Sequence, residues 1–415
     1  MKEVVYLDRL SYWQKKIFII SWFAYALAYL GRANLAIALP KMINTLNLSK
    51  TNAGLIGSFF FWAYAIGQLV NGYIGDKVNS RYFVFCSLLI SALINLLVGF
   101  TSNLVFIIIL WTLNGFTLSM LWGPLIKTLS HWFSKEKRDS VAVKIATSIT
   151  GGYLLTWGFI GWIIGITSWR WAFWSPAIIL GTYSFIWFYK IKPYPEQIGL
   201  KGPEDVFNKD NLSKQNNLIS TKNLILSEKL IFVALTCMSQ GLIREGIILW
   251  GPTFLYTTFK LNQKSIVLFS LFIPFISLMG IIGSGYINKL FKSEKLSIIF
   301  FLGSGAAFLI ILLLTLGINI YINVILLSFT VAAMYGANTL LLTLIPLKYT
   351  KQNMVSSIAG FLDFNSYLGA AFSGVLIGYI IDISRWSIVI IIWLIVAIFG
   401  IISTSISLNS KNNSQ

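Results

Sequence analysis

The chain has 415 residues, of which 56% are hydrophobic and only 11% are charged. Soluble domains carry about 25% charged residues, so this composition excludes an ordinary water-soluble fold. The net charge of +18 raises nucleic acid as a partner, but the basic residues gather at the N-terminus and in every second loop between apolar runs. That alternation is typical of the cytoplasmic side of a membrane protein, so we expect no nucleic-acid partner.

Twelve apolar runs are long enough to cross a bilayer as helices, which takes about 20 residues each. In chain order, the expected spans are 17–39, 53–74, 82–100, 104–127, 141–165, 170–190, 229–257, 265–288, 297–316, 320–345, 354–380 and 386–408. A polar, Asn- and Pro-containing stretch separates the sixth from the seventh. We therefore expect an all-α, multi-pass protein of the cell (inner) membrane with both termini cytoplasmic, made of a six-helix bundle (1–190), a cytoplasmic linker (191–227) and a second six-helix bundle (228–415).

The two halves carry similar motifs at a constant offset. "NGYIGDKVNSR" follows the second span and "SGYINKLFKSEK" follows the eighth, so that Gly72 and Gly285 are 213 residues apart. Arg32 in the first span and Arg244 in the seventh are separated by 212 residues. Such a repeat predicts two pseudo-symmetric bundles with a central site between them.

A guanidinium group inside an apolar span is costly, by roughly 3 to more than 10 kcal/mol, and something must offset that cost. Arg32 and Arg244 would face one another across the central cavity, where an anion could bridge them. Two planar guanidinium forks favour a divalent anion such as a phosphate monoester. The alternative is that each arginine pairs with a carboxylate and locks the bundle. Glu245 adjoins Arg244, but successive residues of a helix do not face each other.

Further polar and aromatic side chains share the faces of these arginines or lie on other intramembrane faces, where such groups usually point into a bundle or a wet cavity. For the aromatic members, packing or an interface belt is the open alternative. The expected neighbours of the central site are Tyr25, Tyr29, Trp122, Gln240, Tyr335 and Asn338.

Four stretches carry a family resemblance: "QLVNGYIGDKVNSRYF", "LNGFTLSMLWGPLIKTLSHWFSKEKRDS", "LIREGIILWGPTFL" and "SIAGFLDFNSYLGAAFSGVLIGYIID". From about residue 20 to 395, the chain resembles the organophosphate:inorganic phosphate antiporters of the major facilitator superfamily, such as the glycerol-3-phosphate and hexose-6-phosphate transporters. The resemblance implies that Arg32 and Arg244 bind phosphate, and that the halves rock to exchange a substrate for inorganic phosphate. We expect a monomer in the lipid bilayer with no cofactor and no metal.

The chain departs from that family at three positions. Ala33, Gln68 and Ser148 stand where the glycerol-3-phosphate carriers have lysine, lysine and histidine, so three cationic or titratable groups are absent. Lys144 lies one turn before Ser148 and either restores a charge or extends to the cytoplasmic surface. Asp363, a lone carboxylate in the eleventh span, is expected to be functional. It either pairs with Lys144 to gate the cavity or receives a cationic or hydroxyl-rich part of the substrate.

The loop after the second span holds Asp76, Lys77 and Arg81. In the superfamily such loops brace neighbouring helices in one conformational state, so we expect a gating role. The alternative is a solvated turn whose charges only set the topology.

The functional prediction is a secondary transporter of organic phosphate esters in exchange for inorganic phosphate, by alternating access. One alternative is a proton-coupled symporter of organic carboxylates that uses Asp363 or Glu245. The other is a transporter-like membrane sensor of sugar phosphates. We expect no enzyme, because neither a nucleophile–base arrangement nor a glycine-rich phosphate loop is visible.

Overall fold

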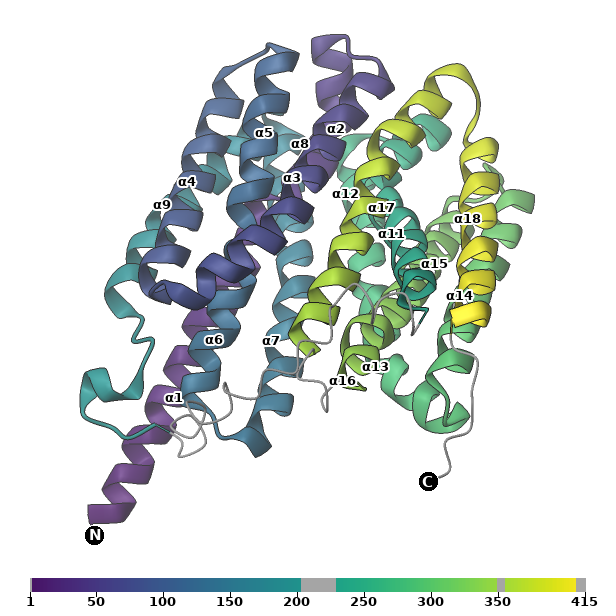
Figure 1. Ribbon diagram of the computed structural model, residues 1–415. Coiled ribbons are helices and arrows are strands. Elements are labelled where there is room, and N and C mark those ends of the chain that lie inside the picture. Colours follow the sequence, from purple (N-terminus) through teal and green to yellow (C-terminus); the bar gives the residue numbers. More distant parts are fainter. Residues whose placement is uncertain (1, 203–228, 349–354, 408–415) are drawn as a thin grey trace.

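In the computed structural model, the described residues are 2–202, 229–348 and 355–407, and these are almost entirely helical, with no strand among them. The expected linker residues 203–227, the start of the eleventh span at 354 and the end of the twelfth at 408 lie outside the described residues. Helix α1 begins, and α18 ends, at one end of the molecule (Figure 1). We call this the linker end, because residues 191–202 lie there, and the opposite end the outer end.

The first half runs from the linker end and contains the first six expected spans (Figure 1). Its elements are α1 (Lys2–Ala28), η1 (Tyr29–Gly31), α2 (Asn34–Leu46), α3 (Lys50–Lys77), α4 (Ser80–Phe100), α5 (Leu104–Leu118), α6 (Trp122–Trp132), α7 (Lys135–Leu155), η2 (Thr156–Ile160), α8 (Gly161–Ile166), α9 (Trp171–Lys190) and η3 (Pro195–Ile198).

The second half contains the other six. Its elements are α11 (Leu230–Phe259), α12 (Gln263–Ser270), α13 (Phe272–Phe291), α14 (Glu294–Leu314), α15 (Ile320–Thr339), η5 (Leu340–Leu344), α16 (Ile345–Leu347), α17 (Val355–Ile383) and α18 (Trp386–Ser407).

Ten helical stretches of the described chain are long and apolar enough to cross a membrane. The two expected spans outside these ten are 17–39 and 170–190. The first is divided by the 3₁₀ turn η1, and the second, helix α9, is rich in tryptophan, serine and tyrosine, which lowers its mean hydropathy. With these two, the described chain follows the predicted twelve-helix arrangement in two bundles.

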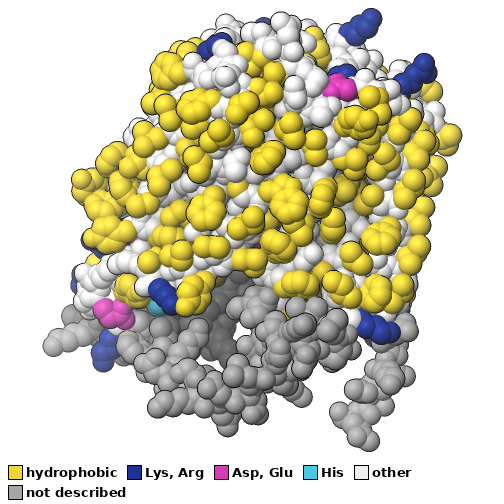
Figure 2. All heavy atoms as spheres, turned by 45° about the horizontal axis from the view of Figure 1, so that its top comes forward, with side chains coloured by type: hydrophobic (Ala, Val, Ile, Leu, Met, Phe, Trp, Pro, Cys, Tyr) yellow, Lys and Arg dark blue, Asp and Glu magenta, His cyan; other side chains and the backbone are white. Residues whose placement is uncertain are grey.

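The sides of the molecule are covered by exposed apolar side chains, and the charged side chains visible in Figure 2 lie near its two ends. Leu314, Ile282 and Phe100, for example, are 73%, 74% and 68% exposed. Water would disfavour so much exposed hydrocarbon, whereas lipid tails accept it. The molecular surface therefore agrees with a protein that is surrounded by lipid.

The halves meet closely where α3 crosses α17. A Cβ atom built on Gly54 would lie 2.2 Å from the carbonyl oxygen of Gly374, and one built on Gly378 would lie 2.3 Å from that of Lys50. These distances are far below van der Waals contact, so only glycine permits this approach. Helix α11 packs against both α17 of its own half and α2 of the other, and α7 packs against α13.

Candidate functional site at the centre of the two halves

Arg32 lies where the first span stops being a regular helix. Helix α1 ends at Ala28, η1 covers the next turn, and α2 starts at Asn34, so Arg32 occupies the interruption. Its guanidinium carbon lies over the ring of Tyr29 at 5.4 Å, Phe60 at 5.7 Å, Phe61 at 5.7 Å and Tyr64 at 4.7 Å, and over Tyr367 of the second half at 5.4 Å (ring centroids).

Each of these aromatic faces attracts a cation modestly, by about 0.5–2 kcal/mol. Within the part of the chain that the structure describes, no carboxylate forms an ion pair with Arg32. Its positive charge is therefore held by aromatic rings of both halves, and none of the described carboxylates forms an ion pair with it. A guanidinium in this state is suited to receive an anion.

Buried amides fix the backbone behind Arg32. The carbonyl group of Gly31 accepts hydrogen bonds from Asn114 at 2.7 Å and Asn95 at 3.4 Å. The side chain of Asn34 donates to Asn95 at 2.9 Å and to the carbonyl oxygen of Ala172 at 2.8 Å. An interrupted helix exposes backbone groups that lipid cannot satisfy, and here side chains of α4 and α5 satisfy the Gly31 carbonyl group, while Asn34 ties α2 to α4 and α9. The position of Arg32 is thus set by hydrogen bonds to the backbone of the preceding residue, Gly31.

Arg244, in α11, is held in a different way. Its Nε donates to Oε1 of Glu245 at 3.2 Å, Nη1 donates to Oε1 of Gln240 at 3.3 Å, and Nη2 lies 3.5 Å from Oγ of Ser366 in α17. Its guanidinium carbon also lies 5.0 Å from the ring centroid of Tyr335. Arg244 and Glu245 are 4% and 3% exposed.

Successive residues of a helix were expected not to face each other, and this expectation is wrong for Arg244 and Glu245. A long arginine side chain can turn back across one residue, and burial favours the pairing. The structure thus places one arginine beside its own acidic neighbour, as the alternative reading held, and leaves the other without an acidic partner among the described residues.

Several predicted neighbours do gather around the two arginines. The amide of Gln240 donates to Oδ1 of Asn338 at 2.9 Å and to Oγ of Ser366 at 2.8 Å, which ties α11 to α15 and α17. The ring of Tyr25 lies 5.6 Å from that of Tyr29 and 4.8 Å from that of Trp122, between ring centroids. The Tyr25–Tyr29–Arg32 series stays in contact although the helix is interrupted.

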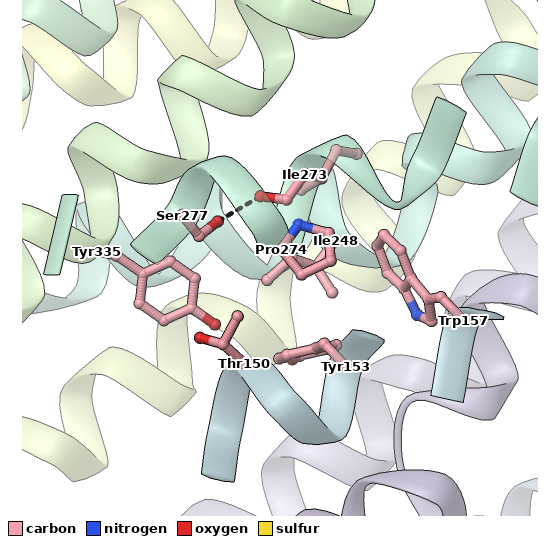
Figure 3. Close-up of a pocket in the computed structure, with 8 residues that line it drawn as sticks. All are labelled: Thr150, Tyr153, Trp157, Ile248, Ile273, Pro274, Ser277 and Tyr335. Carbon is pink, nitrogen blue, oxygen red and sulfur yellow. Dashed lines mark hydrogen bonds between the residues drawn. The ribbon is translucent and has the colours of Figure 1, made fainter. Parts of the chain in front are cut away.

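Two small cavities lie between the halves at this level. One, of about 30 Å³, is lined by Arg32 and Glu245 together with apolar and aromatic residues of both halves. The other, of about 10 Å³, is lined by α7, η2, α11, α13 and α15, with the hydroxyl groups of Thr150 and Tyr335 pointing toward each other (Figure 3). Together they have room for only a few water molecules. A larger solute therefore requires the halves to move apart.

Three predicted residues have fewer contacts in this conformation. Ser148 is buried, and its hydroxyl donates to the carbonyl oxygen of Ile145 in its own helix at 2.5 Å. Lys144 is exposed, and Asp363 is half-buried one turn before Ser366 and Tyr367. No ion pair joins Lys144 to Asp363, both of which are described, so the pairing considered from the sequence is not made here. Asp363 lies within electrostatic range of Arg244, Arg32 and Glu245.

The expected gating loop makes its described contacts inside the first half. Lys77 lies over the ring of Tyr73 at 3.9 Å and donates to its hydroxyl group. Arg81 donates to the carbonyl oxygen of Ile191 at 3.0 Å and to Gln197 at 3.4 Å. The side chain of Asp76 lies outside the described residues. In this conformation Arg81 braces the start of α4 against the end of α9 and η3 rather than against the second half.

Hydrogen bonds between the halves concentrate toward the outer end. The carboxylate of Asp382, in α17, accepts from the backbone N–H of Lys50 at 2.9 Å and of Thr51 at 2.7 Å, and from the Thr51 hydroxyl at 2.7 Å. Asn44 donates to the hydroxyl of Tyr256 at 2.8 Å. At the linker end, no hydrogen bond joins a described residue of one half to a described residue of the other. The hydrogen bonds between described residues thus fasten the two halves together toward the outer end.

Of the five aromatic rings around Arg32, Tyr29 was predicted from the sequence, whereas Phe60, Phe61, Tyr64 and Tyr367 were not. Phe60 and Tyr64 are four residues apart in α3 and so share its inner face, a spacing that was available in "FFFWAY". Tyr367 follows Asp363 by one helical turn in the same way. Ser366, which contacts both Gln240 and Arg244, and Asp382 had no signal of their own.

The described chain thus forms two helical bundles with apolar sides, and the charged residues Arg32 and Glu245 line a cavity between them. A family model described as "Major Facilitator Superfamily" matches residues 21–374. The chain belongs to the Major Facilitator Superfamily, and it is a transporter-type protein and not an enzyme.

Individual relatives are distant but cover nearly the whole chain. The "Probable hexose phosphate transport protein" of Chlamydia pneumoniae is 25% identical over 407 residues, which cover 93% of this chain and 89% of that protein. The "Glycerol-3-phosphate transporter" of Bacillus subtilis (strain 168) is 27% identical over 390 residues, covering 90% and 87%. A crystal structure of a mutant of the nucleoside transporter NupG has a TM-score of 0.77 at 11% identity, covering 95% of this chain and 100% of that one, and supports the fold alone.

Proposed function

We propose that this protein carries an organic phosphate ester across the membrane in exchange for inorganic phosphate, by alternating access around Arg32 and Arg244. The observation that carries the proposal is the Arg32 guanidinium, which lies at the junction of the halves among five aromatic rings with no described carboxylate paired to it. The names of the two relatives, a hexose phosphate and a glycerol-3-phosphate transporter, support an organic phosphate as the substrate class.

In this proposal the phosphate group contacts Arg32 first. A dianion then competes with Glu245 for Arg244, whose Nε–H faces that carboxylate at 3.2 Å. When the anion bridges both guanidinium groups, it draws α1–α2 and α11 together. The favourable energy of this closure offsets the loss of the hydrogen bonds between the halves at the outer end, and new contacts then form at the linker end. A ligand moves such an equilibrium only by binding one state better than the other.

The proposed orientation places the linker end in the cytoplasm, because the lysines and arginines concentrate there, as the positive-inside rule requires. The proposed parts are a bundle over 1–190, a linker over 191–227 and a bundle over 228–415, in the inner membrane and as a monomer. Lys144, Ser148 and Asp363 are proposed to line the path to the site.

Proteoliposomes loaded with inorganic phosphate test the function. We expect radiolabelled phosphate outside to exchange with phosphate inside, and phosphate esters to inhibit that exchange. Uptake driven by a proton gradient and insensitive to phosphate would instead identify a carboxylate symporter. Binding of sugar phosphates with no exchange at all would identify a sensor.

A further inference from the structure

The cavity that contains Arg32 holds a second charged residue, and it comes from the other half. Glu245 is the acidic member of that lining, which is otherwise apolar and aromatic and includes Phe60, Phe61, Trp111 and Tyr153. Arg244 does not line this cavity. A ligand seated against Arg32 therefore meets a carboxylate of α11 within the same small space.

Described residues donate hydrogen bonds to one of the two oxygens of that carboxylate. Oε1 of Glu245 accepts the Nε–H of Arg244 at 3.2 Å, while no described residue donates a hydrogen bond to Oε2. An ionised carboxylate only accepts hydrogen bonds. Oε2 thus offers an acceptor to a donor group on a ligand, and a hydroxyl group is such a donor.

The charges around the site also limit what a ligand can carry. Two guanidinium groups, Arg32 and Arg244, and a second carboxylate, that of Glu245, lie within electrostatic range of Asp363. The formal charge of these four groups is zero when both carboxylates are ionised. A dianionic phosphate already adds negative charge to this buried set, and a further carboxylate on the ligand would face Glu245 at short range.

From this geometry we infer that Glu245 determines specificity by reading the organic part of the substrate: it accepts hydrogen bonds from hydroxyl groups and repels carboxylates. The inference rests on the proposed function and narrows its substrate class to hydroxyl-rich phosphate esters, such as sugar or polyol phosphates. Phosphate esters that carry a carboxylate are excluded, because like charges brought together in a poorly solvated space repel strongly. Asp363 adds to this repulsion from one side.

The test compares two competitors in phosphate-loaded proteoliposomes: a hexose phosphate and 3-phosphoglycerate. We expect the hexose phosphate to inhibit phosphate exchange at a concentration about tenfold or more below that of the phosphoglycerate. In Glu245→Gln, an uncharged variant of the same shape, the ratio is expected to fall toward one. Glu245→Asp keeps the charge and is the matched control, in which the discrimination against the carboxylate persists.

Thermal stabilisation of the purified protein by each competitor measures the same ratio without transport. If the wild type is stabilised equally by both esters, or if Glu245→Gln leaves the ratio unchanged, whatever the effect of Asp363→Asn, the inference is overturned. If the binding ratio is present but phosphate is not exchanged, the inference stands and the proposed antiport fails. A merely structural role for Glu245 would lower both affinities together and leave their ratio unchanged, which also overturns the inference.

Discussion

Arg32 and Arg244 occupy corresponding places in the two halves, yet their surroundings differ. Arg244 is held by Glu245, Gln240 and Ser366, so its direction is set before any ligand arrives. Arg32 contacts aromatic faces, which attract a cation without fixing its hydrogen-bonding direction. This asymmetry suits a site in which Arg32 binds the anion first and Arg244 then gives up its contact with Glu245 to bind the same anion.

Replacing Arg32 by lysine tests this at the residue scale. The variant keeps the charge but loses the planar fork that binds two phosphate oxygens at once. Losing one charge-assisted hydrogen bond is expected to lower phosphate exchange roughly 10- to 100-fold, measured in phosphate-loaded proteoliposomes. Arg170→Lys, at an outer turn where Arg170 donates to Ser102 at 2.6 Å, is the matched control and should keep exchange. Wild-type exchange by Arg32→Lys would contradict a bidentate contact.

Asn114 stabilises the interruption behind Arg32 through its bond to the Gly31 carbonyl group. Asn114→Ala leaves buried polar groups unsatisfied, so we expect the free energy of unfolding to fall by about 1–3 kcal/mol, seen as a lower Tm in detergent. Thr112→Ala in the same helix is the control, because Thr112 bonds only to the carbonyl oxygen of Ile108 in its own helix. An equal and small loss in both variants would show that the interruption does not depend on the amide.

At the scale of elements, α17 closes the outer end by capping a helix of the other half. The N-terminus of α3 has its own cap, Ser49, whose side chain accepts from the backbone of Asn52 at 3.0 Å. Asp382, from the other half of the molecule, provides a second cap by accepting hydrogen bonds from the N–H groups of Lys50 and Thr51. A carboxylate at a helix N-terminus is favoured by both hydrogen bonding and the helix dipole. Opening this end must break those bonds.

Asp382→Asn should therefore shift the protein toward a state that is open at the outer end. Spin labels on cysteines at Thr45 and Lys264, in a background without Cys86 and Cys237, would report the separation by pulsed EPR, with a longer distance expected to gain population. Ser49→Ala removes a cap of about 0.5–2 kcal/mol inside one half and is the matched control. If both variants give the same distance distribution, the bridging cap does not fasten the outer end.

At the scale of the whole molecule, the halves close over a site with only about 30 Å³ and 10 Å³ of cavity at its centre. In the proposed mechanism, closure without an anion places the Arg32 guanidinium in a poorly solvated interior where no described carboxylate forms an ion pair with it, and this is disfavoured. The proposed mechanism therefore predicts exchange rather than one-way transport.

Vesicles that contain phosphate are thus expected to take up a phosphate ester about tenfold or more faster than vesicles that contain none. The control is a set of vesicles loaded with sulfate at the same ionic strength. Equal initial rates with and without internal phosphate would exclude obligatory exchange.

The pattern of apolar runs in the sequence was sufficient to predict the overall arrangement of helices. The length and spacing of the apolar runs set the number of helices, because a backbone in lipid has to satisfy its hydrogen bonds internally. The offset shared by Arg32 with Arg244 and by Gly72 with Gly285 indicated two related halves. Even so, helix boundaries inside the spans, such as the interruption at Tyr29–Gly31, were not visible, because they depend on amides from other helices.

For the site as well, some features were predictable from the sequence and others were not. The sequence alone predicts that Arg32 and Arg244 lie inside the membrane, because each stands within an apolar run that is long enough to span it. Which carboxylate pairs with Arg244, which rings surround Arg32, and that Asp382 caps a helix of the other half were decided only by the tertiary structure. These contacts join residues far apart in the chain or depend on how a long side chain turns, and neither is encoded in local spacing.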